Sequence, residues 1–409
     1  MIKNKLLNTL ILAGFSSVPA LAMADTPAEP AKTSVPTLSQ VLDASGITAS
    51  GYVDVGYTSL NSTGLFVGGA PTRVFDAPNP TAGKNFSSFN LNQASITVAK
   101  APKEGVGGLI NLTAGQDSNV IASYGAGAVA AGAVTPYGNN HNVDATQAYA
   151  SYASGPLTLI AGKFFCLAST EVIPGPSNTN VSRSILFGYA MPYTHTGVRA
   201  TYAATDTLNL IAGVNNGWDQ VADMNADKTV ELGFNVAPSK MFSLAAVYYG
   251  GKELSGGVAA LPAQTSNGNR QLFDLVATIN ATDQLAFVLE YDTASQDNVV
   301  GLANGTTGTA KWDGLAAYVN YQFNEKWRTS LRSEYMNDKD GYKLPFAVGA
   351  TTGQTWSEST LTLAYIPAPG FEIRGEVRSD SSNQNVFLSS DGTAKSGQTS
   401  VGLETLYKF

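Results

Sequence analysis

Charged residues of both signs alternate with other residues near the end of the chain. Residues 371–378 contain four charges, each separated from the next by one residue: Glu372, Arg374, Glu376 and Arg378. A β-strand has a side-chain period of two, so these four side chains would lie on one face. Such a face can form ion pairs with neighbouring strands, or it can line an aqueous path and bias the passage of ions and polar solutes. The sequence leaves both roles open.

The same arrangement occurs in other segments, which enlarges the set of candidate lining residues. Residues 327–335 alternate Trp327, Leu331 and Tyr335 with charged side chains. Candidate lining residues on the polar faces are Lys163, Arg199, Arg328, Arg332, Arg374, Arg378, Glu334, Glu372 and Glu376. An enclosed path with these residues on its inner face would need a closed sheet to position them.

Other kinds of site find little support in the sequence. The chain has two histidines, His141 and His195, and no Gly-x-Ser-x-Gly motif, so we expect no enzyme. His195 stands between two threonines, and a structural hydrogen bond is its simplest role. We expect no metal or other cofactor, because no cluster of His, Cys and acids has metal-site spacing. The single Cys166 excludes an internal disulfide and fits a small buried filler better than a reactive thiol.

Composition narrows the class of protein. The formal net charge is −7, which argues against nucleic acid as a partner. Charged residues make up 13% of the chain, against about 25% in soluble domains. After the N-terminus, no segment has the roughly 18 apolar residues of a transmembrane helix. Low charge with many aromatic and Gly residues favours a membrane-spanning barrel over a soluble enzyme.

The N-terminus resembles a secretory signal peptide. Lys3 and Lys5 precede an apolar stretch at residues 6–15, and small residues follow at positions 20, 22 and 24. We predict a signal peptide at residues 1–24, cleaved before Asp25; cleavage after Ala22 is the alternative. Residues 25–45 would be a periplasmic segment, Pro- and Ala-rich at first. Residues 37–44 form either a short helix, with Thr37 and Gln40 as a capping box, or an unstructured lead-in.

A period of two runs through the rest of the chain. The last residues place Val401, Leu403, Thr405, Tyr407 and Phe409 on one face of a strand. A strand with one apolar face at the very end of a chain is typical of a membrane barrel, where the last strand pairs with the first. We therefore predict an all-β, transmembrane antiparallel barrel over residues 46–409. Residues 86–101 fit this pattern only with a bulge near Asn92 and Gln93.

The connections alternate in length, which predicts the number of strands and their direction. Short turns are expected at residues 102–105, 155–156, 205–206, 238–240, 282–283, 324–326 and 367–370. Long loops are expected at residues 61–85, 118–142, 166–193, 218–228, 251–269, 294–310, 339–354 and 381–397. Outer-membrane barrels have short periplasmic turns and long extracellular loops, so we expect about 16 strands with both ends in the periplasm. Tyrosines and tryptophans near strand ends, such as Trp218, Trp327 and Tyr365, predict an aromatic girdle.

The loop at residues 166–193 is unusually apolar for a surface loop. It carries Ile173, Ile185, Leu186, Phe187 and other large apolar residues. An exposed loop should not present such a surface, so we expect it to fold into the barrel and pack on the inner wall. It would then narrow the lumen, with Glu171 and Arg183 as candidate constriction charges. The alternative is an apolar surface for subunit contact.

The sequence around this loop resembles a family of β-barrel porins called OmpL-like. The resemblance rests on Gly162-Lys163-Phe164, Glu171-Val172, Pro176-Ser177-Asn178, Ser182-Arg183-Ser184, Gly188-Tyr189 and the run from Thr194 to Arg199. It implies a pore in the outer membrane of a Gram-negative cell, in contact with outer-membrane lipid and lipopolysaccharide. It also implies that a terminal aromatic, Phe409 with Tyr407, is recognised by the barrel-assembly machinery.

Taken together, these features predict a porin: a water-filled channel for passive diffusion of small hydrophilic solutes or ions. The alternative is a structural or adhesive outer-membrane barrel with a plugged lumen. Trimers are common among sixteen-stranded porins, and a homotrimer or a monomer would fit this sequence equally well. The transported solute is not encoded in any motif of the sequence.

Overall fold

The computed structural model describes residues 38–67, 72–77, 80, 82–121, 142–223, 225–254, 267–300, 302–344 and 352–409. The predicted signal peptide and His141 lie outside the described residues. The chain divides into two compact units, Met1–Val41 and Leu42–Phe409. Helix α1 (Leu38–Ser45) covers almost the same residues as the short helix considered from the sequence. Gly46 follows the helix with a φ of 68°, which favours glycine, and the amide of Ile47 donates to the carbonyl of Leu42 (3.2 Å).

The described residues of the second unit are mainly β-strands. The barrel strands are β1 (Thr48–Leu60), β2 (Ser87–Lys100), β3 (Gly105–Ala114), β4 (Val143–Ser154), β5 (Leu157–Phe165), β6 (Thr194–Ala203), β7 (Leu208–Asn215), β8 (Thr229–Ser239), β9 (Phe242–Leu254), β10 (Asn267–Asn280), β11 (Leu285–Val300), β12 (Thr307–Asn324), β13 (Trp327–Asp338), β14 (Gln354–Ala368), β15 (Phe371–Ser382) and β18 (Gly397–Lys408). Outside them lie α2 (Ser118–Ile121), η1 (Gly175–Ser177), η2 (Leu186–Ala190) and the small hairpin of β16 (Phe387–Leu388) and β17 (Ala394–Lys395). Among the described residues, no helix is long and apolar enough to cross a membrane.

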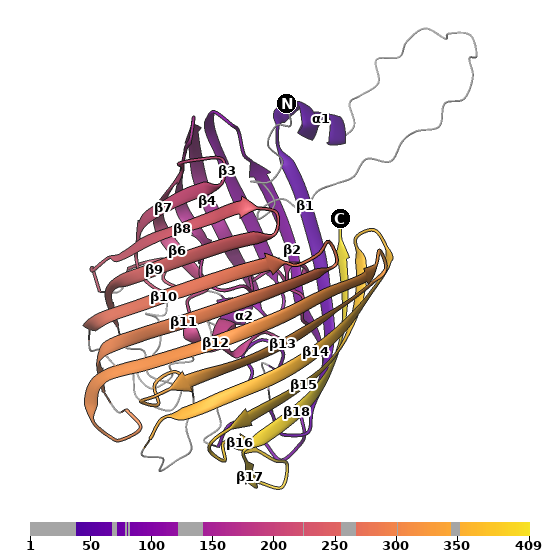
Figure 1. The fold of residues 1–409 in the computed structure, drawn as a ribbon, viewed down its shortest axis with the longest axis vertical. Helices are drawn as coiled ribbons and strands as arrows, with labels where there is room; N and C mark the ends of the chain where they lie inside the picture. The colour runs from indigo at the N-terminus through magenta and orange to yellow at the C-terminus, as the bar shows by residue number, and fades with distance from the viewer. Residues whose placement is uncertain are drawn as a thin grey trace, which may run out of the picture. The chain divides into compact units, whose positions relative to one another are not determined.

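The sixteen strands of the described chain form one closed antiparallel barrel, as the sequence predicts (Figure 1). Each strand pairs with its neighbour in sequence, and β18 closes the ring against β1. At this junction Val53 lies opposite Tyr407, and Gly51 exchanges two backbone hydrogen bonds with Phe409 (2.8 and 2.9 Å). Closure leaves no unpaired strand edge, which is the condition for a sheet to exist in lipid.

The two faces of the barrel are inverted relative to a soluble protein. Along β8, Leu232 points outward and is 51% exposed, whereas Glu231 between the strand's apolar residues is fully buried. Along β11, Leu289 is exposed and Glu290 is buried in the same way. An apolar outer face suits lipid, and polar side chains must then satisfy one another inside. The strand faces predicted from the period of two are confirmed.

The predicted bulge in β2 is present. The register between β1 and β2 shifts between Asp54 and Val55, so that Asn92 is the residue without an opposite partner. The bulge keeps Leu91 and Ile96 both on the outer face. The side chain of the extra residue is also used, because Asn92 Nδ2 donates to Asp54 Oδ1 (3.0 Å).

The connections alternate as predicted, with some differences in length. Turns of two to four residues join β2 to β3, β4 to β5, and so on for every second connection up to β14 and β15. These turns define the short-turn end of the barrel. The other connections define the long-loop end. There, β11 and β12 continue into the predicted loop 294–310 as far as Val300 and Thr307. These extensions are polar, so the apolar alternation fades although strand pairing continues, with a bulge after Gln296.

Aromatic side chains gather at the short-turn end on the outer face. Trp327 and Tyr365 pack with ring centroids 4.6 Å apart, and Tyr407 lies 6.0 Å from Phe409. These positions agree with a girdle at a membrane interface. Trp218 does not belong to it: this side chain is 7% exposed and packs edge-on against Trp312 inside the barrel. The prediction was wrong there because position near a strand end does not determine which face a loop residue takes.

Candidate functional site: the lumen wall and the inward segment

Residues 166–193, here called the inward segment, connect β5 to β6 and pack against the inner wall. The segment contains the single turn η1 and the π-helical turn η2. Its contacts reach the inward faces of β1 and β18 on one side and of β11, β12 and β13 on another. The predicted folding of this loop into the barrel is therefore confirmed.

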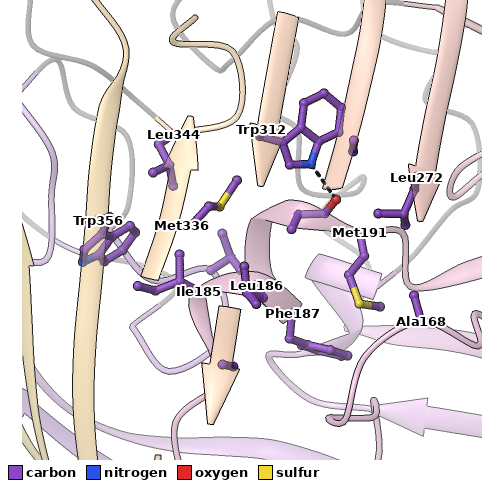
Figure 2. Close-up of a cluster of buried hydrophobic side chains, with 14 of the residues drawn as sticks. Ala168, Ile185, Leu186, Phe187, Met191, Leu272, Trp312, Met336, Leu344 and Trp356 are labelled. Carbon is purple, nitrogen blue, oxygen red and sulfur yellow. Dashed lines mark hydrogen bonds between the residues drawn. The ribbon is translucent and has the colours of Figure 1, made fainter. Parts of the chain in front are cut away.

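An apolar cluster holds the second half of the inward segment. Ile185, Leu186 and Phe187 are each no more than 1% exposed and pack among wall residues that include Met336 and Trp312. Figure 2 shows these side chains converging, with the indole N–H of Trp312 bonded to the carbonyl of Ala190 (2.9 Å). Burial of this kind stabilises by about 1.5–3 kcal/mol for each large side chain. The cluster explains why the sequence places so many apolar residues in a loop.

Two wall carboxylates bind the backbone of the inward segment. Glu334 accepts the amides of Ile185 (2.5 Å) and Leu186 (3.1 Å). Glu376 accepts the amides of Val181 (2.7 Å) and Ser182 (2.9 Å). Backbone amides buried in a lumen need acceptors, and a charged acceptor forms a stronger hydrogen bond than a neutral one. These two predicted lining residues therefore hold main chain.

The wall arginines complete this set from the donor side. Arg332 Nη1 donates to the carbonyl of Ser182 (2.7 Å), and Arg378 Nη1 donates to the carbonyl of Arg183 (2.5 Å). Arg374 donates to the carbonyl of Gly175 (3.3 Å). All three side chains are 2% exposed or less. Guanidinium groups have several fixed donors, so one side chain can bind a carbonyl and a carboxylate together.

The same arginines are also paired with wall acids, Arg332 and Arg374 across strands and Arg378 within β15. Arg332 binds Glu358 (2.5 Å), Arg374 binds Glu404 (3.0 Å), and Arg378 binds Asp380 (2.7 Å). A charge removed from water is tolerated only when it is paired and hydrogen-bonded, and these pairs meet that condition. Both Glu404 and Asp380 were missed by the sequence analysis. Glu404 lies opposite Arg374 of the neighbouring strand, and Asp380 follows Arg378 by two residues on the same face of β15; these spacings are the signals that could have found them.

The two candidate constriction charges lie in the inward segment itself. Glu171 is 4% exposed; it accepts the amide of Ser184 (2.8 Å) and the guanidinium of Arg332 (2.5 Å). Arg183 is 6% exposed and donates to the carbonyl of Ile173 (2.7 Å), with its guanidinium 5.6 Å from the ring centre of Phe187. Both side chains therefore fix the shape of the segment.

Lys163 and Arg199 belong to a different part of the wall. Lys163 binds Asp144 on β4 (3.0 Å), and Arg199 binds Glu231 on β8 (2.5 Å). The guanidinium of Arg199 also lies 4.2 Å from the ring centre of Phe164 and donates to the carbonyl of Phe165 (3.0 Å). These contacts fix the start of the inward segment where it leaves β5.

An open hollow lies at the short-turn end. It has a volume of about 440 Å³ and is lined by Asn178 and Thr179 of the inward segment, by turn residues such as Asp283, and by Arg328 and Glu372. Arg328 and Glu372 are ion-paired with each other and are half-buried. Among the predicted lining residues, these two face this hollow.

The other two residues considered in the sequence, His195 and Cys166, make contacts with protein that suit a structural role. His195 is fully buried, with Nδ1 3.0 Å from the carbonyl oxygen of Gly217 and its ring stacked on Tyr249 at 4.5 Å. Cys166 lies beside the same tyrosine (Sγ to Oη, 3.5 Å), and burial raises the pKa of its thiol. A raised pKa lowers the thiolate fraction and hence the reactivity.

Comparisons with known proteins agree with this architecture. An anion-selective porin from Comamonas acidovorans superposes with a TM-score of 0.57 at 10% identity, over 89% of this chain and 99% of that one. The outer membrane channel DcaP of Acinetobacter baumannii gives 0.55 at 13% identity, over 89% and 97%. The trimer form of OmpT, an outer membrane protein of Vibrio cholerae, gives 0.55 at 9% identity, over 89% and 99%. At these identities the likeness concerns the fold alone.

Sequence comparison identifies the family. A comparison with curated proteins gives no match. The model of the family described as "Putative beta-barrel porin-2, OmpL-like" matches residues 46–409, which is the whole predicted barrel. The chain therefore belongs to this family of OmpL-like porins, and it is an outer-membrane β-barrel with a channel role.

Proposed function

We propose that this porin passes small hydrophilic solutes or ions by passive diffusion, with the inward segment as the constriction. The proposal rests on one observation: charged side chains of the wall form hydrogen bonds with the backbone of the inward segment. Glu334 and Glu376 accept its amides, while Arg332 and Arg378 donate to its carbonyls. A segment held by hydrogen bonds at defined points gives a lumen of fixed width, and width with lining charge determines selectivity.

Selectivity is proposed to reside mainly in Arg328 and Glu372, because they line the open hollow. Arg374 and Arg378 act through the segment they hold, and Glu171 and Arg183 act by shaping it. Lys163 and Arg199 anchor its start. This division assigns each predicted lining residue either to the solute path or to the position of the constriction.

Single-channel conductance of the purified, folded protein in planar bilayers tests the proposal. We expect discrete steps from the wild type. Glu334→Ala removes the acceptor of two segment amides, so it should loosen the constriction and raise the conductance or the frequency of large openings. Glu325→Ala, in the exposed turn between β12 and β13, is the matched control and should behave as the wild type. Heat-modifiable migration in SDS gels confirms that each variant is folded.

A structural or adhesive barrel with a plugged lumen remains the second candidate. The near-complete burial of Arg332, Arg374 and Arg378 under the segment favours it. Absence of discrete steps from both the wild type and Glu334→Ala, with both folded, would reject the channel proposal in favour of this one. Unchanged ion selectivity in Arg328→Glu, measured as the reversal potential in a salt gradient, would reject the assignment of Arg328 to the solute path.

The molecular surroundings are proposed from the location of the protein. A signal peptide at residues 1–24 would direct export, and residues 25–45 would remain in the periplasm. Lipopolysaccharide and lipid would contact the apolar outer face, and the barrel-assembly machinery would recognise Tyr407 and Phe409. A homotrimer is proposed because OmpT, a protein of the same fold, has a trimer form.

A further inference from the structure

Three acidic side chains meet on the inner wall at a point that the proposed solute path does not use. Asp274 on β10 lies directly opposite Asp292 on β11, and Glu290 precedes Asp292 by two residues on the same strand face. All three are 1% exposed or less. Their carboxylate oxygens include a set, one from each residue, that lies within 4.8 Å of one another.

The charge of this cluster is not matched by the protein. Among the described residues, the salt bridges involve other acids, and none reaches Asp274, Glu290 or Asp292. The wall acids Glu358, Asp380 and Glu404 differ in this respect, since each binds an arginine. Directly opposed like charges on neighbouring strands destabilise a sheet unless something compensates them.

Orphaned oxygen atoms are the second, independent observation. Both carboxylate oxygens of the fully buried Asp292 lack a hydrogen-bond partner among the described residues, and so does Oε1 of Glu290. Buried polar atoms are almost always satisfied, so several unsatisfied oxygens at one place indicate a missing electropositive partner.

The cluster is joined to the inward segment by two hydrogen bonds. The amide of Ser169 donates to Oδ2 of Asp274 (3.2 Å), and the amide of Thr170 donates to Oε2 of Glu290 (2.9 Å). Ser169 has a φ of 79°, which is uncommon for a residue other than glycine. The backbone thus adopts a strained conformation at the place where it meets the three carboxylates.

We propose that Asp274, Glu290 and Asp292 form a Ca²⁺ site that fixes the beginning of the inward segment to the wall. All available ligands are hard oxygen atoms, which exclude soft-metal chemistry and suit Ca²⁺ or Mg²⁺. Ca²⁺ binds oxygens at roughly 2.3–2.6 Å with flexible geometry, so one ion can bridge three carboxylates at this spacing. Mg²⁺ demands a tighter octahedron at about 2.0–2.1 Å and keeps several waters, so it should bind more weakly here.

This site was not indicated by the sequence, because its ligands come from two strands and have no metal-motif spacing. Only the register of β10 on β11 brings Asp274 to Asp292. The bound ion would neutralise the repulsion between the carboxylates and leave Oδ2 of Asp274 and Oε2 of Glu290 to hold the two amides. The site is independent of conductance and can be tested on a barrel that does not conduct.

The test uses the full-length barrel refolded in detergent with EDTA, dialysed, and titrated calorimetrically with CaCl₂ and then, separately, with MgCl₂. We expect one Ca²⁺ per chain, weaker binding of Mg²⁺, and a thermal midpoint that rises with Ca²⁺ concentration. Asp292→Asn preserves shape and breaks no hydrogen bond to a described residue, yet it should weaken Ca²⁺ binding at least tenfold. Asp206→Asn, in the exposed β6–β7 turn, is the matched control and should bind as the wild type.

A second test compares the thermal midpoints of the wild type and Asp292→Asn with and without Ca²⁺. In EDTA, Asp292→Asn should have a higher thermal midpoint than the wild type, because one of three repelling charges is gone. In saturating Ca²⁺ the order should reverse. A wild type that shows no saturable Ca²⁺ binding and the same midpoint in EDTA and Ca²⁺ would overturn the proposal, and so would equal affinities of the wild type and Asp292→Asn.

Discussion

Arg332 illustrates how single residues act in this lumen. Its guanidinium binds Glu171 of the inward segment, Glu358 of the neighbouring strand and the carbonyl of Ser182 at once. The sequence left open whether the alternating charges bind one another or serve a solute path. For Arg332 and its fully buried neighbours the contacts are with protein, and among the predicted lining residues only Arg328 and Glu372 border the open hollow. Charge on an inner face is thus used first to position main chain.

Asp117, in the connection after β3, gives a pH prediction at this scale. Burial raises the pKa of its carboxyl from 3.8 to about 8, against the opposing effect of Arg183. The folded state therefore binds this proton more tightly than the unfolded chain, and the free energy of unfolding should fall as the pH rises from about 4 to about 8. Asp117→Asn removes the titration and still accepts the hydrogen bond of Gln93. The free energy of unfolding of this variant should therefore fall less over this pH range than that of the wild type.

Thermal midpoints of the wild type and Asp117→Asn, measured from pH 4 to pH 9, check this prediction. The two curves should lie together near pH 4 and separate progressively toward pH 8, with the variant the more stable. Parallel curves across the whole range would show that Asp117 does not titrate in this window.

At the scale of elements, the junction of β1 and β18 closes the barrel and leaves little room for a side chain at position 51. Gly51 faces the ring of Phe409 so closely that a Cβ at position 51 would lie 2.7 Å from two ring atoms. Glycine is therefore required there for the aromatic ring to lie across β1.

The inward segment is the second decisive element, since its apolar half and its two turns occupy the lumen between β18 and β11.

Phe409→Ala separates two roles of the terminal aromatic. The backbone hydrogen bonds to Gly51 do not need the ring, so refolding of the variant in detergent should be close to that of the wild type. If the ring is an assembly signal, the amount of heat-modifiable barrel in outer-membrane fractions should fall severalfold. Equal amounts of variant and wild type in the membrane would contradict the signal role, and a failure to refold in detergent would assign the ring to closure of the barrel.

At the scale of the whole molecule, the strands on different sides of the barrel differ in length. Strands β3 to β7 have 8 to 12 residues, whereas β11 has 16 and β12 has 18. A strand needs about 9–11 residues to cross the hydrocarbon layer; β5 with 9 residues only just reaches that length, and β7 with 8 residues falls short of it. A side of the barrel that faces another subunit is not bound by this requirement, so we propose that the contact of the proposed homotrimer lies on β3 to β7.

Bulky apolar substitutions test this contact without placing charge in lipid. Ile110 on β3 and Val198 on β6 are more than half exposed on the outer face, and Leu361 on β14 is a matched position on the other side. The double variant Ile110→Trp, Val198→Trp should shift the mass measured by light scattering in mild detergent from trimer to monomer. Leu361→Trp should leave the trimer intact. A wild type that is monomeric in both detergent and lipid nanodiscs would exclude the trimer.

The sequence by itself determined the barrel, because a period of two and alternating short and long connections are local properties of the chain. It located the bulge at Asn92, the pairing of the first and last strands and the burial of the loop at 166–193. What Arg332, Glu334 or Asp292 contacts was decided only by the tertiary structure. Their partners depend on strand register and on the path of the inward segment, which bring together residues far apart in the sequence, such as Arg374 and Gly175, about two hundred positions apart. No local pattern encodes such distances, so the sequence identified the lining face and the structure assigned its contacts.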